Sequence, residues 1–234
     1  MDALILAAGI GSRLQELGEK TPKCLLEVHQ KTLLERQISV LLKNGIQTIY
    51  IVGGYQFEKI KQFIDSTFLN QPIVLIENKE YATTNNMASL LLAKPFLEGR
   101  SFLWLNGDII FEPEVIQGIL SDSFLDAIAI DSTCYFEESM KVTIAENRIQ
   151  SIAKNININQ ASGTSIDLYK ISSKTSFALF NQVDLLLQKD KMQWSEVALN
   201  QILKSHIFLP FYIHSKWVEI DDQEDLFVAQ QLFD

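Results

Sequence analysis

The sequence predicts an α/β fold, with a mixed, mainly parallel β-sheet flanked by helices in a Rossmann-like arrangement. Between residues 3 and 106, short apolar runs alternate with segments whose apolar residues recur at helical spacing, which is the β-α-β-α order of a parallel sheet covered by helices. From residue 124 onward, strand-like runs follow one another with short polar turns, so this half is expected to be strand-rich and to complete the sheet. A length of 234 residues and a hydrophobic content of 47% suit a single domain of this class.

The first predicted strand, residues 3–8, runs directly into a glycine-containing loop. Gly9 and Gly11 allow the backbone to come close to an anionic ligand, and two cations, Arg13 and Lys23, follow them. A tight turn is the simpler explanation for two glycines alone. The glycines together with the two cations favour a phosphate-binding loop, and a triphosphate is the ligand that such a loop suits.

The remaining elements are expected in regular succession. A helix from Leu33 to Ile46 ends at Asn44-Gly45, a typical C-terminal stop, and Glu146-Asn147 is the clearest hairpin signal. The other expected strands are 48–55, 73–77, 101–106, 127–132, 141–154 as a hairpin, 163–171 and 206–214, and the other expected helices are 57–68, 86–93, 174–189, 195–203 and 222–233. Because ligands bind at the carboxyl ends of parallel strands, the loops after the first-half strands should meet in one site.

Composition and charge exclude several classes of partner. A net charge of −9 and a pI of about 4.9 argue against binding to nucleic acid or to an anionic membrane. No apolar run approaches the roughly 18 residues of a membrane span, and Met1 leads straight into a strand without a targeting signal, so a cytoplasmic protein is expected. Cys24 and Cys134 lack metal-type spacing and are expected to be small buried hydrophobes without a role.

Two aspartates follow predicted strands that lie far apart in the sequence. Asp108 comes after SFLWLNG, and Asp221 comes after WVEI. Either could be a turn former or a helix cap, and Asp222 suits the capping role for the last helix. Two strands that each deliver a carboxylate to one place would provide what Mg²⁺ needs, namely one or two carboxylates with phosphate oxygens and water. Asp108 and Asp221 are therefore the predicted metal ligands.

The string LAAGIGSRL followed by PKCLLEV resembles the signature L-A-A-G-x-G-[ST]-R-x(n)-P-K of nucleotidyltransferases. These enzymes join a nucleoside triphosphate to a phosphorylated small molecule and release pyrophosphate. The NGD and W-x-E-I-D segments are similar to the two metal-binding segments of the same family. The resemblance implies Mg²⁺ on the two aspartates and four catalytic residues, Arg13, Lys23, Asp108 and Asp221.

The segment YATTNNMASLLLA narrows this resemblance. It is similar to the T-N-N-x-x-S-L segment of cytidylyltransferases that act on phosphocholine, 2-aminoethylphosphonate and similar head groups. The implied partners are CTP, or another nucleoside triphosphate, and a small phosphorylated or phosphonate acceptor. The implied nucleotide-binding residues are Leu6, Ala7, Ala8, Gly9, Gly11, Ser12, Arg13, Lys23, Asn85, Asn86, Ser89 and Asp108. For Asn85, an N-cap role is the alternative. Residues 1–123 would form the nucleotide-binding lobe, and 124–234 the acceptor-binding lobe, of one domain.

Five residues of the second half are candidates for acceptor binding: Lys141, Lys154, Asp167, Trp194 and Glu196. Either lysine could neutralise the acceptor's phosphate, with Lys141 as the first choice, although a solvated surface lysine is the ordinary state of such a residue. Trp194 could hold a quaternary ammonium by cation–π attraction, and Glu196 could pair with a primary ammonium. Alternatively, Trp194 could simply pack under the helix that follows it.

The implied reaction needs no general base, because the acceptor oxygen that attacks the α-phosphorus of CTP in line is already anionic at neutral pH. Two alternatives stay open. A transferase for inositol phosphate or a sugar 1-phosphate would differ around Trp194, Glu196, Asp167 and Tyr135. A nucleotide-sensing module without catalysis would keep the loop but would not need the intact set of cations and aspartates. A monomer and a homodimer are both compatible with the sequence.

Overall fold

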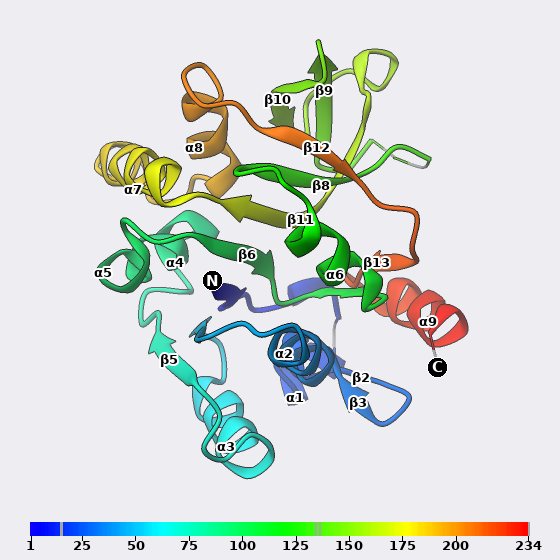
Figure 1. Ribbon diagram of the computed structural model, residues 1–234. Coiled ribbons are helices and arrows are strands. Elements are labelled where there is room, and N and C mark those ends of the chain that lie inside the picture. Colours follow the sequence, from blue (N-terminus) through cyan, green and yellow to red (C-terminus); the bar gives the residue numbers. More distant parts are fainter. Residues whose placement is uncertain (15, 134, 136, 234) are drawn as a thin grey trace.

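The computed structural model describes residues 1–14, 16–133, 135 and 137–233 and is built on a central sheet (Figure 1). Its strands are β1 (Asp2–Ala7), β2 (Glu27–Val28), β3 (Lys31–Thr32), β4 (Ile49–Gly53), β5 (Ile73–Glu77), β6 (Phe102–Asn106), β7 (Ile109–Phe111), β8 (Ala127–Asp131), β9 (Lys141–Ala145), β10 (Arg148–Ala153), β11 (Gly163–Ile171), β12 (Leu209–Tyr212) and β13 (Trp217–Glu219). Its helices are α1 (Glu16–Lys20), α2 (Leu33–Lys43), α3 (Phe57–Thr67), α4 (Asn86–Leu92), α5 (Lys94–Leu97), α6 (Glu114–Ser121), α7 (Ser173–Leu187), α8 (Ser195–Ile202) and α9 (Gln223–Leu232).

Nine strands of the described part form the main sheet, in the order β10-β9-β11-β6-β1-β4-β5, with β8 paired to β11 and β12 paired to β8. The strands β6, β1, β4 and β5 are all parallel. By contrast, β11 runs antiparallel to β6, β8 and β9. The predicted α/β class, with a mixed, mainly parallel sheet and a strand-rich second half, is confirmed. The division into two lobes after residue 123 stays a prediction.

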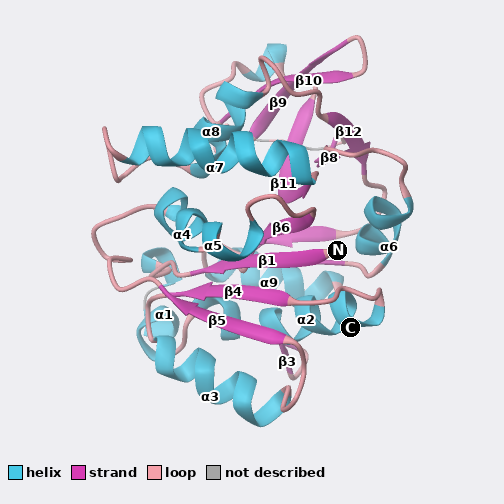
Figure 2. Cartoon of the chain, turned by 60° about the vertical axis from the view of Figure 1, so that its left-hand side comes forward, coloured by secondary structure: helices cyan, strands magenta, loops and turns pink. Residues whose placement is uncertain are grey.

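Helices cover both faces of this sheet (Figure 2). Strand β1 shows the reason: all its residues are buried, with Leu4 and Leu6 in the core on one face and Ala3 and Ile5 in the core on the other. The core on the Leu4 side includes residues of α4, α7 and α8, and the core on the Ala3 side includes residues of α2, α3 and α6. Because both faces are covered, the carboxyl edge of the parallel strands is the expected place for a ligand.

The predicted elements are confirmed in most places, and the shortest ones are missed. The first predicted helix ends at Lys43, since Asn44 caps it and Gly45 has a φ of 77°. Glu146 and Asn147 have φ values of 50° and 56°, as a type I′ turn between β9 and β10 requires. The sequence does not predict β2, β3 or β7, because two or three residues are too few for a periodic pattern, and it also misses the helices α1, α5 and α6.

A two-stranded ribbon of β7 and β13 joins distant parts of the chain at the carboxyl edge. Its antiparallel pairing sets Ile109 opposite Glu219, and the Ile220 N–H donates to the Asp108 carbonyl oxygen at 2.9 Å. Asp108 immediately precedes β7, and Asp221 follows two residues after β13 ends. The ribbon therefore brings together the two aspartates that the sequence nominates as metal ligands.

The described helices include none that is both long and apolar enough to cross a membrane. Cys24 is 2% exposed and belongs to the core packed against α2. Burial raises the pKa of its thiol to about 12, so the thiolate, which is the reactive form, is suppressed. Cys134 lies outside the described residues.

Candidate active site

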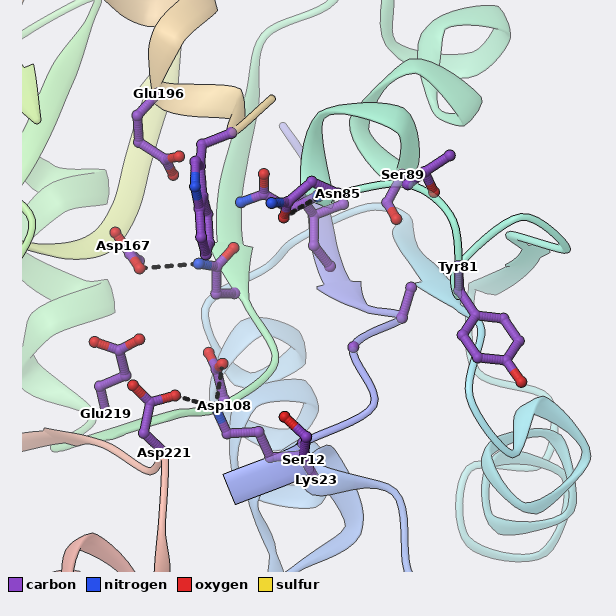
Figure 3. A pocket seen from close by; sticks show the side chains of 18 of the residues that line it. Ser12, Lys23, Tyr81, Asn85, Ser89, Asp108, Asp167, Glu196, Glu219 and Asp221 are labelled. Atoms are coloured by element: carbon purple, nitrogen blue, oxygen red, sulfur yellow. Dashed lines mark hydrogen bonds and ion pairs between the residues drawn. The ribbon is translucent and has the colours of Figure 1, made fainter. Parts of the chain in front are cut away.

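A cavity of about 260 Å³ opens at the carboxyl ends of β1 and β6 (Figure 3). The sequence-predicted residues that line it are Leu6, Ala8, Gly9, Gly11, Ser12, Arg13, Lys23, Asn85, Asn86, Ser89, Asp108, Lys154, Asp167, Trp194, Glu196 and Asp221. The lining residues that the sequence does not nominate are Asn78, Tyr81, Thr84, Asn106, Met140 and Glu219. Ala7 and Lys141 are not part of the lining, and neither is Tyr135, whose hydroxyl donates to the Ala161 carbonyl oxygen at 3.2 Å.

Two glycines, Gly11 in the loop after β1 and Gly107 directly after β6, shape the backbone beside the cavity. Gly11 has a φ of 66°, a left-handed conformation that side chains rarely adopt, and a Cβ there would also lie 3.2 Å from the side chain of Leu14. Gly107 donates its N–H to the Leu6 carbonyl oxygen at 2.7 Å, and a Cβ on Gly107 would lie 2.9 Å from the Ala7 Cβ. The end of β1, from which the phosphate-type loop starts, is therefore in direct contact with the turn that precedes Asp108, and Ala7 lies in this contact and not in the cavity lining.

Three carboxylates gather at one end of the cavity. Asp108, Glu219 and Asp221 each place one oxygen within 4.8 Å of the others. Lys23 lies between two of them, and its Nζ donates to Asp108 Oδ2 and Asp221 Oδ1, each at 2.7 Å. Arg13 donates from Nη2 to Asp221 Oδ2, also at 2.7 Å. The predicted cations and aspartates thus meet in one place, where they pair with one another.

These charges shift one another's pKa. Burial would lower the pKa of Lys23, but Asp108 and Asp221 raise it above its ordinary value. Burial would raise the pKa of Asp221, but Lys23 and Arg13 hold it below its ordinary value. For Glu219, burial and the charges of Asp108 and Asp221 act in the same direction and raise the pKa to about 7. Glu219 is therefore less well neutralised by the protein's own cations than Asp221 is.

The three carboxylates fit a hard divalent cation. Oδ1 of Asp108 is buried and has no hydrogen-bond partner among the described residues, so it is an available ligand atom. Mg²⁺ prefers oxygen ligands and leaves positions for phosphate oxygens and water, so Asp108, Glu219 and Asp221 would hold it. Glu219 is the residue that the sequence argument misses. The available signal is its spacing of two from Asp221, which places side chains on one side of an extended chain.

A second, separate pair of carboxylates, Asp167 and Glu196, lies farther along the same side of the cavity (Figure 3). The Tyr169 hydroxyl joins them, 2.9 Å from Asp167 Oδ1 and 3.4 Å from Glu196 Oε1. Asn106 Nδ2 donates to Asp167 Oδ2 at 2.9 Å, whereas Glu196 Oε2 is buried without a hydrogen-bond partner in the described part of the chain. Burial raises the pKa of both carboxyl groups.

The backbone around Asp167 is unusual. The register of β11 against β8 shifts between Ser165 and Tyr169, and Asp167 has a φ of 57° within that bulge. Non-glycine residues seldom hold this conformation, which concentrates at functional sites. The Asp167 N–H donates to Ser165 Oγ at 3.0 Å, so the bulge is held by the side chains of the strand itself.

Trp194 stands at the N-cap of α8 with 48% of its surface exposed. The Lys154 Nζ lies 5.0 Å from the centroid of its ring, and both residues line the cavity. Trp194 is therefore not packed beneath the helix. Lys141 is 1% exposed, and its ammonium donates to the carbonyl oxygens of Glu137 and Ser139. Of the two lysines, Lys154 is the one that the structure places in the cavity.

The start of α4 combines capping with a place in the cavity. Asn85 is the N-cap residue, and its Oδ1 accepts from the Asn86 N–H at 2.8 Å. Its Nδ2 donates to the Met192 carbonyl oxygen at 3.2 Å, and Asn86 Oδ1 accepts from the Ser195 N–H at 2.8 Å. The capping role expected as the alternative for Asn85 is therefore present. The same two side chains connect α4 to the segment that carries Trp194.

Residues 3–146 match the family model described as the MobA-like NTP transferase domain. The chain belongs to this family. It is a nucleotidyltransferase, and the resemblance carried by LAAGIGSRL and the T-N-N segment is confirmed, because its relatives include cytidylyltransferases named for phosphoglutamine, choline phosphate and 2-aminoethylphosphonate.

Two relatives and one solved structure illustrate the range of this similarity. The chain is 34% identical over 127 residues to CMP-5'-(3-aminopropyl)phosphonate synthase of Streptomyces rubellomurinus, a match that covers 54% of this chain and only 20% of that protein. It is 25% identical over 240 residues to CTP:phosphoglutamine cytidylyltransferase of Campylobacter jejuni, covering 94% of this chain and 93% of that one. The inositol-1-phosphate CTP transferase from T. maritima superimposes with a TM-score of 0.81 at 22% identity, covering 99% and 94% of the two chains, and shows the shared fold.

Proposed function

We propose that this protein transfers CMP from CTP to a small phosphorylated or phosphonate acceptor that carries an amino group, with Mg²⁺ and with release of pyrophosphate. One observation carries the proposal. A single cavity joins the carboxylates of Asp108, Glu219 and Asp221 at one end to the buried pair of Asp167 and Glu196 farther along. The first group suits a metal and phosphates, and the second suits a cation supplied by the acceptor.

The chemistry at the first group is positioning and charge neutralisation. The acceptor's phosphate or phosphonate oxygen attacks the α-phosphorus in line, the bond from that phosphorus to the bridging oxygen breaks, and pyrophosphate leaves. Bound Mg²⁺ would neutralise charge on the reacting phosphates. Arg13 and Lys23 would leave their aspartate partners for the triphosphate and stabilise the charge that develops on the leaving group. No side chain has to remove a proton.

The electrostatics of Asp167 and Glu196 support the assignment of an acceptor that carries an amino group. Asp167 is 7% exposed and Glu196 is 3% exposed, and neither forms an ion pair with a cation in the described part of the chain. A buried carboxylate is costly unless it is paired, and the raised pKa of both groups reflects that cost. An ammonium group on the acceptor would supply the missing positive charge and would give Glu196 Oε2 a donor.

The position of Trp194 favours a primary over a quaternary ammonium. Its ring already faces the ammonium of Lys154 at 5.0 Å, which leaves the carboxylates as the free recognition groups. Carboxylate oxygens bind best to groups that donate hydrogen bonds, and a quaternary ammonium has no N–H. Lys154, held beside the ring, is then available for the acceptor's phosphate or phosphonate.

A pyrophosphate-release screen tests the proposal. Four nucleoside triphosphates would be combined with phosphorylated or phosphonate primary amines, phosphocholine, polyol phosphates and sugar 1-phosphates, with and without Mg²⁺. We expect the highest kcat/KM for CTP with a primary amine, and little turnover without the metal. A polyol or sugar phosphate that outperforms every amine would replace the acceptor assignment. Binding of CTP without any turnover across the panel would support the nucleotide-sensing alternative.

A further inference from the structure

We infer that Lys23 acts as a resident counter-ion of the metal site, so that a divalent cation binds tightly only after a nucleotide has drawn this lysine away. The inference rests on the proposed function for the nucleotide and for its place at the loop after β1. It concerns this chain's own lysine and predicts an order of events: free metal binds weakly, nucleotide binds and recruits Lys23, and the vacated carboxylates then take the metal.

The geometry of Lys23 supports the first step, in which free metal binds weakly because the lysine occupies its place. Its Nζ lies 2.7 Å from Asp108 Oδ2 and 2.7 Å from Asp221 Oδ1, so one ammonium bridges two of the three clustered carboxylates. The Lys23 side chain is 12% exposed, so this bridge is shielded from solvent screening. An ammonium and a divalent cation cannot both occupy the position between these oxygens, since like charges repel strongly at such short range.

The position of the Lys23 alkyl chain supports the second step, in which a bound nucleotide recruits the ammonium. The Cβ of Lys23 lies 3.5 Å from the point where a Cβ would stand on Gly11, so the stem passes directly beside the loop proposed to bind phosphates. The backbone there is fixed in a 3₁₀ turn, Lys23–Leu25, with the Leu26 N–H donating to the Lys23 carbonyl oxygen at 3.1 Å. The flexible four-carbon stem can therefore turn its ammonium from the carboxylates to a bound phosphate while the backbone stays in place.

This exchange makes nucleotide and metal mutually dependent. If a bound triphosphate removes Lys23 from the carboxylates, it raises the affinity for metal, and linkage requires the metal to raise the affinity for nucleotide by the same factor. A purely structural role for Lys23 would be different. In that case the ammonium would hold Asp108 and Asp221 in place, and removing it would weaken metal binding.

Arg13 offers a matched control, since it is also a cation on this cluster. It contacts only Asp221, from Nη2 to Oδ2 at 2.7 Å, and its side chain is 60% exposed. Removing Arg13 lowers the total positive charge by the same amount as removing Lys23. It does not vacate the position between Asp108 and Asp221.

The test measures Mn²⁺ binding to the nucleotide-free protein by electron paramagnetic resonance, for wild type, Lys23→Met and Arg13→Met. We expect Lys23→Met to bind Mn²⁺ about tenfold more tightly than wild type, within the range of about 5- to 150-fold usual for coupled sites. Arg13→Met should change the affinity by less than about threefold, because an exposed ion pair is screened. Equal or weaker Mn²⁺ binding by Lys23→Met than by wild type would overturn the inference, and so would an equal gain in Arg13→Met.

A folding control and a titration with bound nucleotide complete the Mn²⁺ binding test. Thermal melts monitor folding, and Lys23→Gln, which is neutral but can still donate a hydrogen bond, replaces Lys23→Met if the methionine variant is unfolded. Titrations in the presence of a non-hydrolysable CTP analogue should raise the Mn²⁺ affinity of wild type more than that of the Lys23 variant. Because the nucleotide-free titration needs neither CTP nor an acceptor, failure of the proposed function leaves its outcome unaffected, and the two can fail separately.

Discussion

The two acidic groups in the cavity are built differently. Asp108 and Asp221, at the metal end, are paired with Lys23 and Arg13, whereas the carboxylates farther along receive only neutral donors, such as the Tyr169 hydroxyl, from the described residues. Counter-ions that can be displaced suit ligands that bring negative charge, such as phosphates with their metal. Carboxylates without a counter-ion suit a ligand that brings positive charge. The difference separates the phosphate end of the site from the amine end.

The largest expected effect is at the metal end. Asp108→Asn and Asp221→Asn should each lower kcat/KM by at least about a hundredfold, because a neutral amide cannot replace a carboxylate on a hard dication. Pyrophosphate release against Mg²⁺ concentration measures this, and excess chelator should abolish the activity of wild type. Full turnover in chelator, or an unchanged Mg²⁺ dependence in either variant, would remove the two-aspartate metal site. Thermal melts exclude loss of the fold.

The two cations should differ in importance. Lys23→Ala and Arg13→Ala should both reduce turnover, and Lys23→Ala should reduce it more, since Lys23 is 12% exposed and Arg13 is 60% exposed. Raising the salt concentration should weaken the contribution of Arg13 and leave that of Lys23 nearly unchanged. Near wild-type pyrophosphate release by either folded variant would contradict its assignment to the triphosphate.

At the amine end, Glu196→Gln should weaken binding of a primary amine acceptor about 10- to 100-fold while the KM for CTP stays within about twofold, in line with about 1.5–3 kcal/mol for a hydrogen bond to a charged group. Tyr169→Phe is the matched control, because it removes the bridging hydroxyl and keeps both carboxylates. Its effect should be smaller. An equal loss for CTP and acceptor would show a general disturbance of the site and not amine recognition.

Trp194 should have a smaller effect that depends on the acceptor. Trp194→Ala removes a cation–π contact of an exposed ring, which is worth about 0.5–1 kcal/mol, so kcat/KM should fall only a few-fold for a primary amine. If the ring serves mainly to hold Lys154, then Lys154→Ala should cause a loss at least as large, and the double variant should lose little more than Lys154→Ala alone. A selective loss of phosphocholine turnover in Trp194→Ala would instead mean that the ring binds a quaternary ammonium directly.

The sequence could predict most of the fold because its first half alternates strands and helices with clear periodicity. It could also nominate Arg13, Lys23, Asp108 and Asp221, because the two cations follow the glycine-containing loop in a short motif and the two aspartates follow strands. It could not place Lys154 in the cavity and Lys141 outside it, since both lie in similar strand-rich contexts. Only the folded chain shows that Lys141 is buried and donates to nearby backbone carbonyl oxygens. Nor could it nominate Glu219, because only the pairing of β7 with β13 brings this residue to Asp108.

The smallest expected effect on activity belongs to Asp222, the neighbour of a predicted metal ligand. Its Oδ1 accepts from the N–H groups of Glu224 and Asp225 at 2.8 and 3.1 Å, and Asp225 Oδ2 accepts in return from the Asp222 N–H at 3.1 Å. This capping box, predicted as an N-cap role, begins α9. Asp222→Ala should therefore lower the free energy of unfolding by about 1 kcal/mol, as loss of an N-cap typically does.

The same substitution should leave kcat/KM and the Mg²⁺ dependence within about twofold of wild type. Denaturant unfolding and pyrophosphate release measure the two quantities on one preparation, and Asp222→Ser, which can still cap the helix, should recover most of the stability. Asp221→Asn should show the reverse pattern, with a large loss of activity and little loss of stability. If Asp222→Ala instead abolished the response to Mg²⁺ while the protein stayed folded, Asp222 would replace Asp221 as the metal ligand. The metal site would then lie at the N-terminus of α9.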